Sequence, residues 1–147
     1  MTLVVYVCAS FRFAERVEEI EGFLVERGIE VLTSKVADPR GMRTCLEKIA
    51  RADVVYAFLP DGVGRSLAFD LGYAVALKKS IYVSHPVHDP PIDDFVVDAL
   101  APEELIGVVE KIQQARFAAV AIEPGSTGTD AVPSKKRRRR RPKREPQ

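Results

Sequence analysis

Two short segments of this chain carry side chains that could bind a phosphorylated ligand and act on it. Ser10 and Arg12 directly follow one apolar run, while Gly64 and Ser66 follow another, with Asp70 four residues further on. A hydroxyl, a guanidinium and the free N–H groups of a starting helix are groups that bind phosphate. A carboxylate nearby can serve as a nucleophile or a base. The pattern therefore predicts an anion site beside a reactive carboxylate.

The same residues also have purely structural interpretations. Ser10 can cap the helix that follows it, Arg12 can pair with a surface acid, and Gly64 can serve only the geometry of a turn. His85 and His88, in a later loop, are typical of solvated residues, although a loop at that edge could touch a ligand. The residue pattern leaves both interpretations open.

Alternating apolar and amphipathic segments would position these side chains. Strands are predicted at 3–8, 29–32, 54–59 and in the segment ending at Val83, with a short edge strand at 94–97; helices are predicted at 15–27, 44–51, about 67–77 and 102–116. In the first helix, a core stripe of Val17, Ile20, Phe23 and Leu24 recurs at helical spacing. This alternation predicts an α/β fold, a single Rossmann-like or flavodoxin-like domain with a doubly wound parallel sheet of four to five strands. Ligands bind such sheets at the carboxyl ends of the strands.

Composition excludes several classes of protein. At 46% hydrophobic and 29% charged residues, the chain is typical of a globular domain. No apolar run approaches the ~18–20 residues of a membrane span, and the first residues read as a strand, so we expect a cytoplasmic protein without membrane contact. Cys8 and Cys45, with two histidines, support neither a disulfide framework nor a metal site, and we expect no cofactor.

The charge is distributed unevenly along the chain. Residues 135–147 hold nine Lys/Arg and one Glu, a formal charge of +8, which leaves −7 on residues 1–134 of a chain whose formal charge is +1. We expect an α/β domain at 1–120, a flexible linker at 121–134 and a disordered basic tail at 135–147. The tail could contact nucleic acid non-specifically through residues 135–144, or fold back onto the acidic body.

Three motifs together resemble a known family. Residues 5–12 (VYVCASFR), 52–57 (ADVVYA) and 68–74 (AFDLGYA) are similar to the nucleoside 2-deoxyribosyltransferase family, most of all to its 2′-deoxynucleoside 5′-phosphate N-hydrolase branch. The resemblance covers about Leu3 to Pro86. It implies that Asp70 is the nucleophile, that Tyr6 lies beside it, and that Ser10 and Arg12 bind the 5′-phosphate. It also implies a homodimer.

The chain departs from the family pattern at two positions. The family nucleophile is Glu, and Asp70 is one methylene shorter. An Asp that assists departure of the base in the family corresponds, in ungapped register, to Cys45. A thiol is a poorer general acid than a carboxyl at neutral pH.

The expected activity is hydrolysis of the N-glycosidic bond of (deoxy)nucleoside 5′-monophosphates, releasing free base and sugar phosphate. One alternative is a nucleotide-binding protein of the same family with weak or no catalysis. Another is a nucleoside deoxyribosyltransferase, and a third is a scaffold whose function resides in the basic tail.

Overall fold

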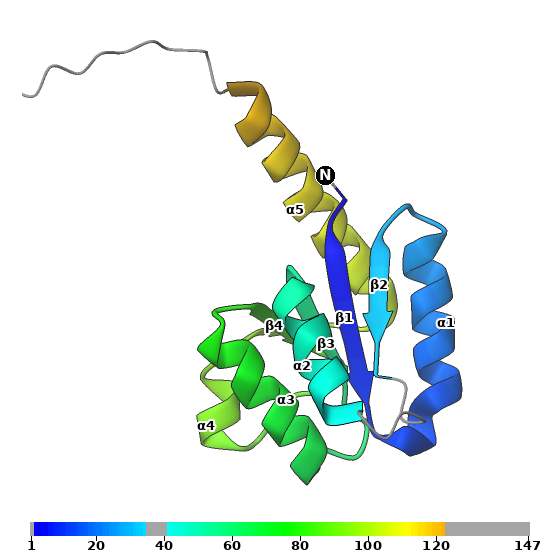
Figure 1. Cartoon of the computed structure of the whole chain (residues 1–147), viewed down its shortest axis with the longest axis vertical. Coiled ribbons are helices and arrows are strands. Elements are labelled where there is room, and N and C mark those ends of the chain that lie inside the picture. The colour runs from blue at the N-terminus through cyan, green and yellow to red at the C-terminus, as the bar shows by residue number, and fades with distance from the viewer. Residues whose placement is uncertain (1, 35–40, 123–147) are drawn as a thin grey trace, which may run out of the picture.

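The chain forms a five-stranded parallel sheet with helices on both faces (Figure 1). The structure is a computed structural model and describes residues 2–34 and 41–122. The strands are β1 (Val4–Ala9), β2 (Glu30–Thr33), β3 (Val54–Phe58), β4 (Ser80–Val83) and β5 (Val96–Ala99). The helices are η1 (Phe11–Phe13), α1 (Ala14–Val25), α2 (Gly41–Arg51), α3 (Arg65–Ala76), α4 (Pro90–Asp93) and α5 (Pro102–Ile122).

The strand order, β2-β1-β3-β4-β5, confirms the predicted doubly wound α/β fold. β1 and β3 are neighbours in the middle of the sheet, and Ala9 lies opposite Phe58 at their carboxyl ends. The chain leaves β1 toward α1 on one face and leaves β3 toward α3 on the other. The loops after β1 and β3 therefore diverge, and such a switch point is where ligands bind in open α/β sheets.

Alternation along β1 decides which side chains face which helices. Val5 and Val7 belong to the core under α1 and α5, whereas Tyr6 and Cys8 belong to the core under α2 and α3. This follows from the two-residue period of a strand. Tyr6 is consequently on the same side of the sheet as α3, the helix that carries Asp70.

Three predicted details were wrong. Phe23 is 40% exposed, because it lies about 100° around α1 from Leu24, off the stripe formed by the buried Val17, Ile20 and Leu24. The edge strand begins at Val96, two residues later than predicted, because the amides of Asp94 and Phe95 bond back into α4. The last helix continues to Ile122, beyond the predicted end at residue 116.

The predicted tail at 135–147, and the linker from residue 123 onward, lie outside the described residues. No helix in the described ranges is long and apolar enough to cross a membrane. Among residues 2–34 and 41–122 there is also no group of three His, Cys, Asp or Glu side chains that could hold a metal ion. The cytoplasmic location, the homodimer and the nucleic-acid contact stay predictions.

Candidate functional site

Asp70 is a buried carboxylate without a hydrogen-bond partner. It lies in the second turn of α3, facing the sheet, and is only 7% exposed. Its Oδ1 atom is buried and accepts no hydrogen bond from any residue that the structure describes. Burial raises the pKa of Asp70 from 3.8 to about 6. A buried polar atom left unpartnered costs about 1–3 kcal/mol, so such an atom in a folded protein suggests a functional role.

The Tyr6 hydroxyl is a second buried group of this kind. Tyr6 is completely buried, and its hydroxyl has no hydrogen bond of good geometry within the described part of the chain. Burial raises the pKa of Tyr6, and Cys8, Cys45 and Asp70 raise it further because they lie close by. The structure thus brings together Tyr6, Cys45 and Asp70, the three residues predicted to be catalytic, between the sheet and helices α2 and α3.

Cys8 joins this cluster, although no sequence motif singles it out as a site residue. Its thiol donates to the carbonyl of Tyr56, with a sulfur–oxygen distance of 3.8 Å. Burial raises the pKa of Cys8, and the nearby Asp70 adds to the shift. Cys8 therefore stays a neutral thiol that helps to make the surroundings of Asp70 poor in water.

The predicted phosphate-binding residues lie in the two loops that diverge at the switch point. Ser10 is at the N-cap position of η1, but its hydroxyl makes no capping hydrogen bond. Arg12 forms an ion pair with Asp61 of the loop after β3, and the two side chains are 64% and 50% exposed. Such an exposed pair contributes at most about 1 kcal/mol, so a stronger anion could replace Asp61.

Gly64 and Ser66 begin α3 at the same edge of the sheet. Gly62 needs glycine because its φ is +83°, whereas Gly64 has an ordinary φ of −80°. A Cβ added at Gly64 would meet no atom within 4 Å. Turn geometry therefore does not explain Gly64. The free amides of the first turn of α3 and the exposed hydroxyl of Ser66 are open to a ligand there.

A groove of about 390 Å³ adjoins these loops at the carboxyl ends of β3 and β4. It is lined by residues of two loops: Leu59, Pro60, Gly62, Val63, His85, Pro86, Val87, His88 and Asp89. The sequence pattern favours solvated positions for His85 and His88, and it does not single out Asp89. One sequence feature could have identified these three residues: they directly follow a buried strand, at the edge of the sheet where ligands bind.

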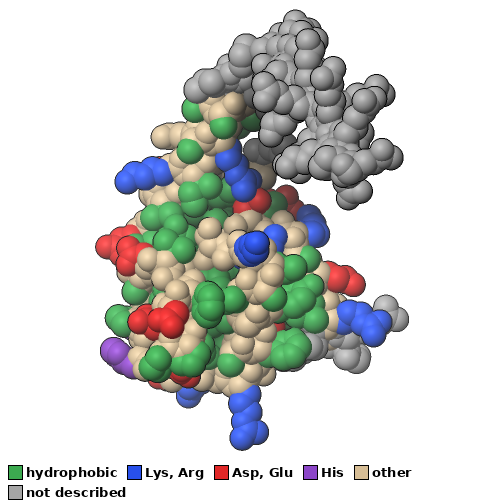
Figure 2. Space-filling view, turned by 90° about the vertical axis from the view of Figure 1, so that its left-hand side faces the viewer, with side chains coloured by type: hydrophobic (Ala, Val, Ile, Leu, Met, Phe, Trp, Pro, Cys, Tyr) green, Lys and Arg blue, Asp and Glu red, His purple; other side chains and the backbone are tan. Residues whose placement is uncertain are grey.

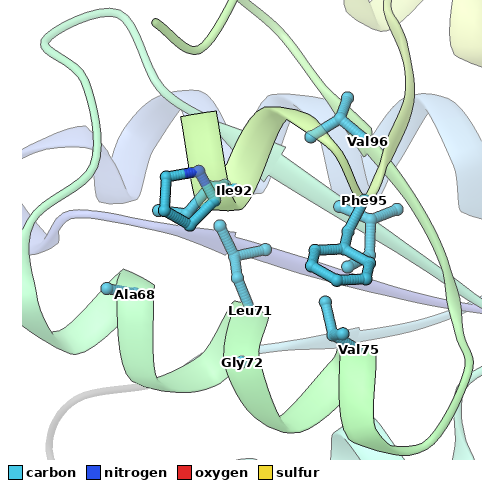
Figure 3. Close-up of a pocket in the computed structure, with 9 residues that line it drawn as sticks. Ala68, Leu71, Gly72, Val75, Ile92, Phe95 and Val96 are labelled. Carbon is cyan, nitrogen blue, oxygen red and sulfur yellow. The ribbon is translucent and has the colours of Figure 1, made fainter. Parts of the chain in front are cut away.

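A second hollow, of about 230 Å³, lies on the other side of α3, against α4 and β5 (Figure 3). Its walls are apolar and include Leu71, Val75 and Phe95, and Asp70 does not line it. The face that carries α4 shows hydrophobic side chains among acidic ones (Figure 2), and Phe95 and Val97 are 54% and 59% exposed. No residue that lines this hollow has a polar side chain, so none of them can act as a nucleophile or a base.

Comparison with known proteins supports the fold. No protein-family model matches the chain, and neither does any curated protein sequence. Similar solved structures include a response regulator receiver protein from Pseudomonas putida, 21% identical with a TM-score of 0.52, covering 76% of this chain and 98% of the other. The CMP N-glycosidase BcmB from Clostridium botulinum is 18% identical with a TM-score of 0.48, covering 74% and 98%. A 3-dehydroquinate dehydratase-like protein from Bifidobacterium longum is 11% identical with a TM-score of 0.49, covering 79% and 98%. The match to the receiver protein, at a TM-score above 0.5, supports the fold alone, and none of the three structures assigns an activity.

Proposed function

We propose that this protein hydrolyses the N-glycosidic bond of nucleoside 5′-monophosphates, with Asp70 as the nucleophile. The observation that carries the proposal is the pair of buried, unpartnered groups, the Asp70 carboxyl and the Tyr6 hydroxyl, which lie near each other within the described residues. The three sequence motifs that resemble the nucleoside 2-deoxyribosyltransferase family give these same two residues adjacent roles. Chemistry and resemblance thus support the same site.

The reaction proceeds as a double displacement. The ionised Asp70 attacks the anomeric carbon, the carbon–nitrogen bond breaks, and its electron pair leaves with the base, which takes up a proton. Water then attacks the glycosyl ester and gives up a proton, which releases the sugar phosphate and regenerates Asp70. The negative charge of Asp70, held in a site poor in water, stabilises the positive charge that develops on the sugar.

Tyr6 and Cys45 assist Asp70 in this proposal. Because the pKa of Tyr6 is raised, its hydroxyl keeps its proton and can donate a hydrogen bond to the Asp70 carboxylate as the substrate binds. The thiol of Cys45 stands near the hydroxyl of Tyr6, where the family resemblance expects an acid that assists the leaving base. Both groups act as hydrogen-bond donors beside Asp70 in this proposal.

The substrate phosphate would bind at the switch point between β1 and β3. Ser10 and Arg12 supply a hydroxyl and a guanidinium, while Gly64 and Ser66 supply backbone amides and a second hydroxyl. On binding, Arg12 exchanges the carboxylate of Asp61 for the phosphate. This remote contact holds the sugar so that its anomeric carbon faces Asp70.

A second candidate function is nucleotide binding without turnover. It is favoured by the short side chain of Asp70, which is 7% exposed, and by the thiol of Cys45 where an acid is expected. A misplacement of about 1 Å can cost on the order of 100-fold in rate. Binding of the phosphate does not depend on either residue.

Release of free base tests the proposal directly. The purified full chain is incubated with each of the four deoxynucleoside monophosphates, and the free base is measured by chromatography. We expect the wild-type protein to release base and Asp70→Asn to lose on the order of 10⁴-fold in rate, as expected for removing a nucleophile. Because the pKa of Asp70 is about 6, release should rise with pH and level off above that value.

Asp93→Asn, at an exposed acid of α4, is the matched control and should keep full activity. Near-normal turnover in Asp70→Asn would exclude Asp70 as the nucleophile. Tight binding of nucleotides without release of base would favour the second candidate. Transfer of the sugar to an added second base, in preference to water, would identify a deoxyribosyltransferase instead.

A further inference from the structure

The groove at the carboxyl ends of β3 and β4 has the size and chemistry of a binding site for a planar heterocycle. Its volume of about 390 Å³ falls within the range of small-molecule sites, roughly 300–1,000 Å³. Apolar side chains of Pro60, Val63 and Val87 form much of the wall, and His85 and Asp89 add polar groups. Pro60 and Gly62 flank Asp61, the partner of Arg12, so the groove adjoins the proposed phosphate site.

Hydrogen bonds hold the His85 ring in one orientation. The backbone amide of Leu59 donates to Ser84 Oγ at 2.7 Å, and Ser84 Oγ lies 2.7 Å from His85 Nδ1. The Ser84 hydroxyl, which accepts from the Leu59 amide, can donate its own hydrogen to Nδ1, and in that tautomer the His85 ring carries its hydrogen on Nε2. The ring also packs edge-on against Phe58, with centroids 6.0 Å apart. In this tautomer His85 offers the groove a hydrogen-bond donor.

Asp89 offers the complementary acceptor. It occupies the N-cap position of α4, yet its side chain makes no capping hydrogen bond there. Its carboxylate forms no ion pair within residues 2–34 and 41–122 and is exposed along the groove. Negative charge from Asp89 disfavours an anion in this groove, so the phosphate belongs at Arg12 and the groove suits an uncharged ligand.

We propose that this groove binds the nucleobase, and that His85 and Asp89 select bases that carry an exocyclic amine beside a ring acceptor. Cytosine and adenine present both groups, whereas uracil and thymine present a carbonyl oxygen in place of the amine. The Asp89 carboxylate accepts from the amine and is repelled by the carbonyl oxygen, while His85 donates to the ring acceptor. The inference rests on the proposed function only in taking a nucleotide as the ligand.

The pair 5′-dCMP and 5′-dUMP tests this inference, because the two bases differ only in the amine or carbonyl at C4 and in the adjacent N3, which accepts a hydrogen bond in cytosine and carries a hydrogen in uracil. Binding is measured by calorimetry with the full chain carrying Asp70→Asn, so that neither ligand is consumed. We expect dCMP to bind about tenfold or more tightly than dUMP, the ratio that one hydrogen bond to a charged acceptor supports. Asp89→Ala should reduce this ratio severalfold, and Asp89→Ala combined with His85→Ala should bring it close to one.

Two further variants distinguish base selectivity from a general loss of nucleotide binding. His85→Ala should weaken binding of dCMP and leave dUMP nearly unaffected, because only cytosine has the ring acceptor; Asp93→Ala, one turn along in α4 and outside the groove, should leave the ratio unchanged. An unchanged ratio in Asp89→Ala, or a wild-type preference for dUMP, would overturn the inference. Selective binding that depends on Asp89, in a wild-type protein that releases no base, would uphold this inference while the proposed hydrolysis fails. Absence of binding of either nucleotide would overturn both.

Discussion

Asp53 and Asp70 occupy opposite ends of the same βα unit. Within residues 2–34 and 41–122, the fold gives hydrogen-bond and ion-pair partners to the first carboxylate and not to the second. Asp53 lies just before β3, where its Oδ2 accepts from the amide of Val4 at 2.9 Å and its Oδ1 pairs with Arg116 at 2.9 Å. Asp70, beyond the other end of the strand, has no such partners among the described residues. The first carboxylate ties β1, β3 and α5 together, whereas the second contributes no contact of this kind to the fold.

The pKa values of the two carboxyls reflect their hydrogen-bond partners. Burial opposes ionisation of both groups, but the hydrogen bonds from Arg116 and Val4 lower the pKa of Asp53 overall. Nothing offsets burial at Asp70, and its pKa rises to about 6. A buried carboxylate with hydrogen-bond partners in the protein has a structural role, whereas one without such partners is available to bind a ligand.

Replacing Asp70 should therefore stabilise the protein, and increasingly so as pH rises through the range between its unfolded and folded pKa values. The folded state binds a proton at Asp70 more tightly than the unfolded chain does, so the stability that this group contributes falls as pH rises from 3.8 through about 6. Relative to the wild type, Asp70→Asn should gain about 2 kcal/mol in free energy of unfolding between pH 4 and pH 7.5. Urea unfolding at the two pH values measures this difference, and a difference independent of pH would contradict the raised pKa.

Asp53→Ala should have the opposite effect on stability. The variant leaves the Val4 amide without its acceptor and frees Arg116, so we expect a loss of about 1–3 kcal/mol at neutral pH. Because the pKa of Asp53 is lowered on folding, this loss should shrink as pH falls from 3.8 through the lower pKa of the folded state, where the wild-type carboxylate takes up its proton. Urea unfolding at pH 7 and at pH 3 measures both values. Equal losses at the two pH values would show that Asp53 acts through packing rather than charge.

The sequence predicted the sheet well because its central strands carry strong local signals. The apolar runs at β1 and β3, buried on both faces, admit few other assignments, and the alternation with helices determines a parallel sheet. The edge elements were less predictable. A Pro-rich segment forms the short helix α4, and β5 alternates weakly because it is exposed at the edge of the sheet.

The candidate site was predictable in part. Tyr6 and Asp70 could be identified from motifs, since each lies on an element with a strong local signal. The pairing of Arg12 with Asp61 and the shared groove of His85 and Asp89 could not, because each depends on how two loops from different strands pack together. Local sequence does not determine such loop-to-loop contacts.

The smallest expected effect concerns the exposed pair of Arg12 and Asp61, which contrasts with both buried carboxylates. If phosphate replaces Asp61 as the partner of Arg12, Arg12→Ala should weaken binding of a nucleoside 5′-monophosphate about tenfold and leave the bare nucleoside unaffected. Asp61→Ala removes the competing carboxylate and should strengthen binding of the monophosphate by up to about fivefold, the equivalent of an exposed ion pair. Calorimetric titration of both ligands against both variants measures these opposite shifts. Equal losses for nucleoside and nucleotide in Arg12→Ala would make the pair structural, because only a direct contact with the phosphate depends on its presence in the ligand.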